Sequence, residues 1–215
     1  MSSFKNSDGK SILMRMVKGI QENKAYLGEV DGLIGDGDHG MNMNKGFSVF
    51  EKRFGGAEFS FSEGLSNLGM ILMNEIGGSM GPIYGTILME MSDAIDQKGK
   101  EEIELSDFAE YLNAGLQGLY GLVDARTGDK TLVDALAPAA ASLQKDAAAG
   151  TGFAAALENM KQAAAAGRDS TRELMARFGR SSRLGERSRG VLDAGAASCC
   201  IILTAMADGI AELLK

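Results

Sequence analysis

The sequence predicts an all-α protein, a single-domain bundle of about eight antiparallel helices. Apolar residues recur at helical spacing along nearly the whole chain. Proline occurs twice and glycine 29 times in 215 residues, so glycines are expected mainly in connections and at close contacts between helices. No segment shows the alternation of a half-buried strand, and the short connections favour antiparallel neighbours. No composition shift marks a boundary, so residues 1–215 are interpreted as one domain.

Each predicted helix has an apolar stripe, and several have a recognisable first turn. Ser60 and Glu63 have the spacing of a capping box. A proline is tolerated in a first turn because its missing N–H would be unpaired there anyway. The residues expected in caps or first turns are Ser60, Pro82, Ser106, Thr131, Ser170 and Asp193. The expected helices cover residues 12–20, 43–54, 60–76, 82–95, 106–119, 131–143, 153–164, 170–178 and 192–213.

Composition and charge exclude several classes of protein. The net charge of −7 argues against a nucleic-acid binder that works by neutralising phosphates. The longest uncharged run, 194–207, is too short to span a bilayer, and charges interrupt any signal-peptide pattern at the N-terminus. Cys199 and Cys200 lie in an apolar run and are expected to be buried free thiols. We therefore expect a cytoplasmic protein that binds neither nucleic acid nor membrane.

A glycine-rich loop gathers negative charge that the fold alone does not explain. Asp31, Asp36 and Asp38 lie within eight residues, between glycines. Carboxylates held this close repel one another unless a cation lies among them. Mg²⁺ prefers oxygen ligands and commonly completes its shell with substrate phosphates. A helix is expected to begin near Gly40, and free N–H groups at a helix start favour anions. The loop therefore predicts a site for Mg²⁺ and a phosphate-bearing ligand.

Three other interpretations of this loop are weaker. Gly35-x-Gly37-x-x-Gly40 matches a dinucleotide fingerprint, but that motif needs a preceding strand, and here aspartates occupy the gaps. An EF-hand that began at Asp36 would have Phe47 where its bidentate glutamate belongs. A solvated acidic turn is the plain alternative. It leaves the neighbouring polar residues before the helix unexplained.

Three further segments have a structural and a functional interpretation. Residues 77–81 match the G-x-S-x-G nucleophile elbow, but no strand precedes them and the single histidine lies upstream, so a hydrolase is disfavoured. The glycines would pack helices closely and expose N–H groups to phosphate. Residues 128–131 lack Walker A spacing and form a capped turn. The arginine-rich run 179–190 is either a solvated face or a clamp for polyphosphate, since guanidinium groups fit phosphate oxygens.

Together these motifs resemble a known family. Residues 35–44 (GDGDHGMNMN), 77–82 (GGSMGP), 128–131 (GDKT), 179–188 (GRSSRLGERS) and 193–195 (DAG) occur in that order. They resemble the nucleotide-binding L subunit of bacterial dihydroxyacetone kinase, which is equivalent to the C-terminal domain of the single-chain ATP-dependent enzymes. The resemblance runs essentially end to end. It implies a barrel of eight antiparallel helices with an adenine nucleotide (ADP or ATP) and two Mg²⁺ at one end.

The resemblance also implies roles for residues that match the family's motifs. Asp31, Asp36 and Asp38 would be the Mg²⁺ ligands, Arg180 would stabilise the transferring phosphoryl group, and Leu132 would line the adenine pocket. The residues expected to bind the nucleotide are His39, Gly40, Met41, Asn42, Gly78, Ser79, Met80, Gly128, Thr131, Leu132, Gly179, Arg180, Asp193, Ala194 and Gly195.

By the same resemblance the chain is a phosphotransferase that is active only with a partner. A K-type subunit would hold the ketone through its own histidine, which agrees with a lone His39 in the metal loop here. In the phosphotransferase-system branch, ADP stays bound and an M-type subunit rephosphorylates it; glycerol metabolism is the implied setting. A homodimer is expected. The alternative is a nucleotide-state sensor that binds a transcription regulator, as some L subunits do.

The sequence departs from the family pattern at three places. Met80 replaces a small residue or serine, Ala194 stands where proline is usual, and residues 121–127 lack the usual basic lead-in. These departures leave open which ketose is phosphorylated, with a four-carbon ketose as one alternative, and how firmly nucleotide is retained. The phosphoryl donor, free ATP or an M-type subunit, is also left open. The aspartates are unaffected.

Overall fold

The apolar stripes of the sequence form the inner faces of α-helices in the computed structural model, which describes residues 2–214. Within these residues the α-helices are α1 (Gly9–Glu22), α2 (Lys24–Gly32), α3 (His39–Phe54), α4 (Phe61–Glu75), α5 (Met80–Lys98), α6 (Leu105–Leu122), α7 (Val133–Ala149), α8 (Phe153–Ser170) and α9 (Ala194–Leu213). The shorter elements are strands β1 (Ser3–Lys5) and β2 (Glu102–Glu104) and the 3₁₀ helices η1 (Asn6–Asp8), η2 (Thr171–Glu173) and η3 (Arg180–Ser188).

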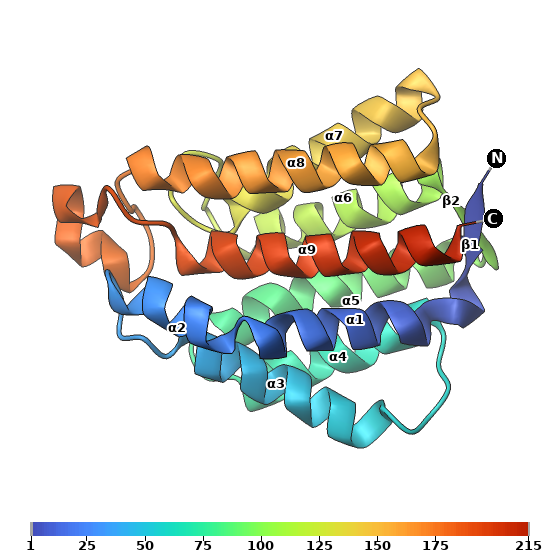
Figure 1. Cartoon of the computed structure of the whole chain (residues 1–215), viewed down its shortest axis with the longest axis horizontal. Coiled ribbons are helices and arrows are strands. Elements are labelled where there is room, and N and C mark those ends of the chain that lie inside the picture. The colour runs from blue at the N-terminus through green and yellow to red at the C-terminus, as the bar shows by residue number, and fades with distance from the viewer. Residues whose placement is uncertain (1, 215) are drawn as a thin grey trace.

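The helices close into a barrel, as the family resemblance implies. From α3 onward each helix packs against the next one in the chain, and α9 packs against α1. Figure 1 shows the long helices running along the longest axis, with both termini and the β1–β2 pair at one end. The core near that end includes aromatic contacts of Phe4 with Phe61 and Phe153. The loops that carry the predicted metal site lie at the other end of the barrel.

The expectation of no strands is wrong for one small sheet. Strands β1 and β2 pair antiparallel, with Phe4 opposite Ile103. Each strand has three residues and contributes one fully buried side chain, Phe4 or Ile103. Strands this short are too brief for alternation to be seen in a sequence.

Among the predicted helix starts, the caps at Ser60 and Asp193 are confirmed and the one at Ser106 is wrong. Ser60 accepts a hydrogen bond from the Glu63 N–H, and Glu63 accepts one from the Ser60 N–H, which is the capping box. Asp193 caps α9 by accepting the N–H of Ala196 at 2.7 Å. Ser106, in contrast, does not cap α6. Glu104 is the cap there, and the side chain of Asp107 accepts the Glu104 N–H.

One predicted helix is absent from the structure, and one helix of the structure was not predicted. The expected helix over 170–178 is wrong, because α8 continues through Ser170. The hydroxyl of Ser170 donates to the Gly167 carbonyl instead of capping a new helix, and only the three-residue η2 follows. Helix α2 was missed. It buries only Leu27 and Val30 and contains two glycines, so its periodicity is weak.

Helix α9 is the most apolar element, and it lies in the core. By length and composition alone it could cross a membrane, but 72% of its apolar window is buried inside the protein. Cys199 and Cys200 on this helix are free and buried, as expected. Burial raises the pKa of both thiols, which disfavours thiolate chemistry.

Acid is expected to weaken the fold through Asp107. This carboxylate is 1% exposed, lies 2.7 Å from Lys98 Nζ and accepts hydrogen bonds from Lys100 and the Glu104 N–H. Burial opposes ionisation, but these donors hold the pKa of Asp107 below its ordinary value. Because the folded-state pKa is lowered, the stability contributed by Asp107 is present above the unfolded-state pKa of about 3.9 and is lost as pH falls through the folded-state pKa.

The measurement is urea unfolding from pH 7 down to pH 2. Asp107→Asn should lower the free energy of unfolding by roughly 1–3 kcal/mol at pH 7, and the gap to wild type should shrink as pH falls below about 4. Asp96→Asn, at an exposed position on α5, is the matched control. A gap that stays constant with pH would contradict this role of Asp107.

Candidate active site

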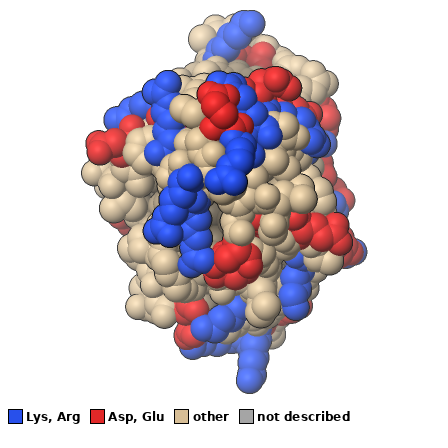
Figure 2. Space-filling view, turned by 90° about the vertical axis from the view of Figure 1, so that its left-hand side faces the viewer, with Lys and Arg blue, Asp and Glu red and all other residues tan. Residues whose placement is uncertain are grey.

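A cavity of about 680 Å³ opens at the end of the barrel away from the small sheet. It is lined by the end of α2, the loop before α3, the starts of α3, α5 and α9, and residues of the loops after α6 and α8. Figure 2 looks at this end of the molecule and shows Lys and Arg side chains gathered on it among Asp and Glu. Helix starts, carboxylates and one arginine, Arg180, therefore surround one cavity.

The three aspartates of the glycine-rich loop come together in this cavity. Asp31 lies in the last turn of α2, and Asp36 and Asp38 lie in the loop that leads to α3. One oxygen from each carboxylate lies within 4.8 Å of the other two. Asp31 also accepts the N–H of His39, at 3.4 Å, which ties the end of α2 to the start of α3. The three aspartates, which are close together in sequence, are therefore also close together in space.

These carboxylates fit a hard divalent cation. Three like charges this close are unfavourable without a positive group between them, and an all-oxygen donor set suits Mg²⁺. The protein itself supplies a cation at this place, because the guanidinium of Arg180 pairs with Asp36. The Arg180 side chain remains 65% exposed, so it is free to move. A positively charged group is therefore accommodated among the aspartates.

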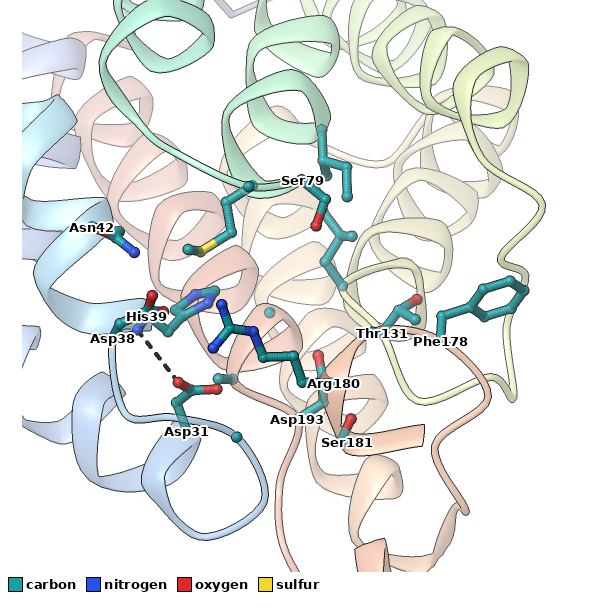
Figure 3. A pocket seen from close by; sticks show the side chains of 18 of the residues that line it. Asp31, Asp38, His39, Asn42, Ser79, Thr131, Phe178, Arg180, Ser181 and Asp193 are labelled. Carbon is teal, nitrogen blue, oxygen red and sulfur yellow. Dashed lines mark hydrogen bonds between the residues drawn. The ribbon is translucent and has the colours of Figure 1, made fainter. Parts of the chain in front are cut away.

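Arg180 reaches the carboxylates from across the cavity. It begins η3, in the loop between α8 and α9, and follows Gly179, whose φ of 69° lies in the left-handed region. Figure 3 shows its side chain extending toward Asp31, Asp38 and His39, with Ser79 on another wall. A fixed-charge donor opposite three carboxylates suits a ligand that carries both phosphate and metal.

Two helices begin at the cavity without a side-chain N-cap, and the first N–H of α3, that of His39, donates to Asp31. Helices α3 and α5 begin after Asp38 and Ser79, and neither residue makes a side-chain capping hydrogen bond. Gly78, with a φ of 73°, lets the chain turn into α5. Because uncapped helix starts favour anions, these two starts are suited to phosphate oxygens.

Part of the cavity lining is apolar. Its residues come from the loop after α6, the residue before α7, the first turn of α5 and the residue before Gly179. They include Ile83, Val123, Ala125, Leu132 and Phe178. Apolar lining of this kind suits a flat aromatic group such as a nucleobase.

Most residues expected at the site line this cavity, and three do not. Met41 is 63% exposed and is not among the residues that line the cavity. Gly40 packs against the Lys24 carbonyl of α2. The N–H of Gly128 donates to Asp134 in the turn before α7. The expected residues that line it are Asp31, Asp36, Asp38, His39, Asn42, Gly78, Ser79, Met80, Thr131, Leu132, Gly179, Arg180, Asp193, Ala194 and Gly195.

Sequence reasoning missed Lys130, which fixes the loop that carries Arg180. Lys130 is 1% exposed, and its ammonium donates to the carbonyls of Thr171 and Val191, at the two ends of that loop. It adopts a φ of 61°, unusual for a residue other than glycine. Burial lowers the pKa of Lys130. The sequence alone does not show that a lysine is buried. The available indication was that Lys130 belongs to the G-D-K-T motif.

Lys130→Met should loosen the loop and destabilise the fold. Two carbonyls would lose their donor, and unpaired buried polar groups cost roughly 1–3 kcal/mol each. We expect the free energy of unfolding to fall by about 2–4 kcal/mol and proteolysis between residues 172 and 190 to become faster. Lys145→Met, at an exposed position of α7, is the control. Unchanged proteolysis would contradict the role of Lys130.

The single histidine of the chain is buried at the start of α3. His39 Nε2 lies 2.8 Å from the hydroxyl of Ser198 on α9, which in turn lies 2.7 Å from the hydroxyl of Tyr84 on α5. Burial lowers the pKa of His39 to about 4, although Asp31 acts in the opposite direction. The imidazole is therefore neutral at pH 7. Sequence reasoning did not find Ser198 or Tyr84, because both are separated from His39 along the chain.

The cavity's carboxylates also include Asp193, the cap of α9. Desolvation raises the pKa of Asp193 to about 7, while the Ala196 N–H and the nearby Lys130 favour its charged form. Asp193 Oδ2 accepts the N–H of Ala196. Its role in the structure is thus to begin α9, as the sequence predicts.

Comparison with known proteins gives consistent results. A model of the DAK2 domain matches residues 33–208. The ADP-binding subunit DhaL of PEP-dependent dihydroxyacetone kinase 1 from Listeria innocua is 36% identical, over 87% of this chain and 88% of that protein. The ADP-binding subunit DhaL of a PTS-dependent dihydroxyacetone kinase from Lactococcus lactis is 38% identical, over 89% and 91%. These relatives are matched over nearly their whole length.

Longer relatives match over part of their length. L-erythrulose kinase from Pectobacterium atrosepticum is 30% identical over 87% of this chain, but this chain spans only 32% of that protein. The crystal structure of the dihydroxyacetone kinase of C. freundii superposes with a TM-score of 0.73 at 22% identity, over 95% of this chain and 35% of that one. A structure of that kinase in complex with AMP-PNP and Mg²⁺ gives a TM-score of 0.71 at 21% identity, over 93% of this chain and 33% of that one. At this identity the likeness shows a shared fold.

Proposed function

The chain belongs to the DAK2 domain family, and from this premise we propose that it is the nucleotide-binding subunit of a kinase for dihydroxyacetone or a related short ketose. In this proposal it binds ADP and ATP with Mg²⁺ and transfers a phosphoryl group to a ketone held by a K-type partner subunit. The observation that carries the proposal is the cluster of Asp31, Asp36 and Asp38 opposite Arg180, at uncapped helix starts.

Each group at the site has a part in the proposed transfer. Asp31, Asp36 and Asp38 would hold two Mg²⁺, which when bound offset the negative charge of phosphate oxygens. The starts of α3 and α5 would orient the phosphates through their N–H groups. Arg180 would leave Asp36 and stabilise charge on the transferring group, since it is a donor with a fixed charge on an exposed side chain.

The reaction conserves atoms and charge across the two subunits. A hydroxyl oxygen of the ketose forms a bond to the γ-phosphorus of ATP as the bond from that phosphorus to the bridging oxygen breaks. The hydroxyl proton passes to a base. We assign that base to the partner subunit, because in this chain His39 is already engaged by Ser198 and the aspartates are assigned to metal.

Several finer points belong to the proposal. Dihydroxyacetone is the first substrate to test, because relatives matched over nearly their whole length are named as subunits of dihydroxyacetone kinases. Erythrulose is the second, because erythrulose kinases are also similar to this chain. An M-type subunit would be the donor that rephosphorylates bound ADP. We also propose a homodimer, which sedimentation would measure.

The test is reconstituted turnover. The purified chain, its K-type partner and MgATP, or phosphorylated M-type partner, are mixed with dihydroxyacetone or erythrulose, and the ketose phosphate is measured by mass spectrometry. We expect product only when chain, partner and Mg²⁺ are all present. Nucleotide binding without transfer to either ketose would contradict the kinase proposal and favour a nucleotide-state sensor that acts on a regulatory protein.

A further inference from the structure

Exposed apolar side chains gather around the mouth of the cavity. Within residues 2–214 seven large apolar side chains are exposed, and four of them lie in or directly beside the cavity lining. Phe178 lines the cavity and is 39% exposed. Leu33, Met41 and Leu122 each directly precede a lining residue and are 66%, 63% and 49% exposed. We call these four residues the apolar rim.

The packing of the barrel does not account for the apolar rim. Its members come from different elements, since Leu33 follows α2, Met41 lies in the first turn of α3, Leu122 ends α6 and Phe178 lies between η2 and η3. None of them belongs to the hydrophobic core of residues 2–214 or packs against it. Single exposed apolar side chains are ordinary, but a group of them around a cavity indicates a surface that another molecule covers.

A basic segment lies beside the apolar rim. Residues 168–190 contain seven arginines and three acidic residues, in a chain whose net charge is −7. Arg183 and Arg187 on η3 are exposed, and the ion pairs found for this segment within residues 2–214 involve its other arginines. Figure 1 shows the segment at the extreme end of the molecule, and Figure 2 shows Lys and Arg side chains gathered on that end. The mouth therefore combines apolar side chains with positive charge that is free to pair.

Contacts inside the chain hold the basic segment in shape. The fully buried hydroxyl of Ser188 accepts the N–H of Ala176 at 2.9 Å and donates to the Gly185 carbonyl at 2.6 Å. These contacts do not involve the guanidinium groups of Arg183 and Arg187, so substitutions there should leave the fold intact. A surface that is already ordered also loses less conformational entropy when another protein binds to it.

Charge distinguishes a second copy of the chain from a different protein as the molecule that covers this surface. In a two-fold contact the same patch of each copy faces the other. Such a contact would bring two arginine-rich segments together, and like charges across an interface are unfavourable. A partner with acidic side chains around an apolar patch would match the surface. The proposed transfer needs a partner at this place, because its ketone must reach a phosphoryl group inside the cavity.

We propose that the apolar rim, together with Arg183 and Arg187, docks the K-type subunit that holds the ketone, and that the docking face of this subunit is acidic with an apolar centre. The existence of the partner rests on the proposed function. Docking covers the mouth of the cavity and excludes water from the phosphoryl group during transfer. Arg183 and Arg187 lie outside the cavity lining, so they strengthen docking without binding the nucleotide.

The kinetics of docking test the part of the charges. Surface plasmon resonance would measure binding of the chain, loaded with MgADP, to the purified K-type subunit at low and at high salt. The double variant Arg183→Glu/Arg187→Glu should associate at least about tenfold more slowly at low salt, with a weaker dependence on salt. Lys52→Glu/Lys145→Glu makes the same change of net charge at exposed positions outside the cavity lining. This control should associate within about threefold of the wild-type rate.

The apolar contribution is tested separately. Leu33→Ala should weaken docking about tenfold, mainly through faster dissociation, because the apolar surface that docking buries becomes smaller. Met70→Ala is the matched control, since Met70 on α4 is 44% exposed and does not line the cavity. It should change the dissociation rate by less than about twofold. Affinity for MgADP, measured for every variant as a check on fold and site, should be unchanged.

The outcomes for the docking surface and for the proposed function are distinct. If the chain and the K-type subunit form ketose phosphate, but the rim variants dock as wild type does or the controls lose as much, the docking surface is wrong and the proposed function stands. If the wild-type chain binds MgADP but neither docks nor transfers, both are wrong. If sedimentation shows that Leu33→Ala instead separates two copies of the chain, the surface is a homodimer interface and the docking proposal is overturned.

Discussion

Asp36→Asn is expected to lower the affinity of the chain for MgADP by at least about 100-fold, since loss of even an outer-shell partner of a metal ligand commonly costs 10–100-fold. Asp36 lies in an exposed loop, and its carboxylate is one of three within 4.8 Å of one another. The substitution keeps the shape of the side chain and removes its charge. The helical fold should be unchanged, because no core contact involves Asp36.

The measurement is calorimetric titration of MgADP, with circular dichroism to check the fold. Asp93→Asn, at an exposed position on α5, removes the same charge away from the cavity and should leave affinity unchanged. The Asp36→Asn variant should also release Arg180, which pairs with Asp36 in the wild-type chain. Affinity retained within a few-fold would count against Asp36 as a metal ligand.

Gly40→Ala is expected to have the largest effect on both fold and site. A Cβ atom at Gly40 would lie 2.0 Å from the Lys24 carbonyl oxygen and 2.8 Å from the Gly28 nitrogen, both in the backbone of α2. Backbone atoms cannot relieve such a clash by rotating away, as the end of a flexible side chain can. Helices α2 and α3 would therefore separate, and Asp31 on α2 would move away from Asp38. Overpacking of this kind typically costs 1–3 kcal/mol and occasionally more, and we expect about 3 kcal/mol or more here.

Urea unfolding measures this cost, and titration with MgADP measures the effect on the site. Gly56→Ala is the control, because a Cβ there would meet no atom within 4 Å and its φ is not positive. It should change the free energy of unfolding by no more than about 0.5 kcal/mol. If Gly40→Ala unfolds at the same urea concentration as wild type, the close approach of α2 and α3 does not determine the fold.

Local sequence signals predicted the features that depend on neighbouring residues. The capping box at Ser60 and the cap at Asp193 need only residues three positions apart. The all-α class and the antiparallel order followed from apolar periodicity and short connections, whereas the barrel followed from the family resemblance. The aspartate cluster followed from charge density within a short segment. Each of these is visible in sequence because the interacting groups are close along the chain.

The features that were missed depend on distant residues or on weak local patterns. Helix α2 buries two apolar side chains and contains glycines at 28 and 32 that serve the packing of α3 and the loop. The paired strands are stabilised by each other and by the core, not by their own residues. Lys130 acts on carbonyls 41 and 61 positions away. No local sequence pattern indicates contacts between residues that are this far apart along the chain.

The segment between α8 and α9 shows the same limit. The helix expected over 170–178 is absent because Ser170 completes α8, and contacts with distant residues fix the chain after η2. The N–H of Gly190 donates to the Arg172 carbonyl, and that of Asp193 donates to the Thr171 hydroxyl. These contacts close the loop at its base and hold Arg180 over the aspartates. Sequence composition left a solvated face and a clamp for polyphosphate as alternatives, and the fold brings Arg180 of this segment to the cavity.

We propose that the aspartate cluster binds an adenine nucleotide through Mg²⁺. The most direct test is calorimetric titration of ADP into chain that has been stripped of nucleotide, once with excess Mg²⁺ and once with EDTA. We expect one ADP to bind per chain with Mg²⁺ and no binding in EDTA. Equal affinity in the two conditions, or no binding of ADP in either, would show that the cluster does not bind nucleotide through Mg²⁺.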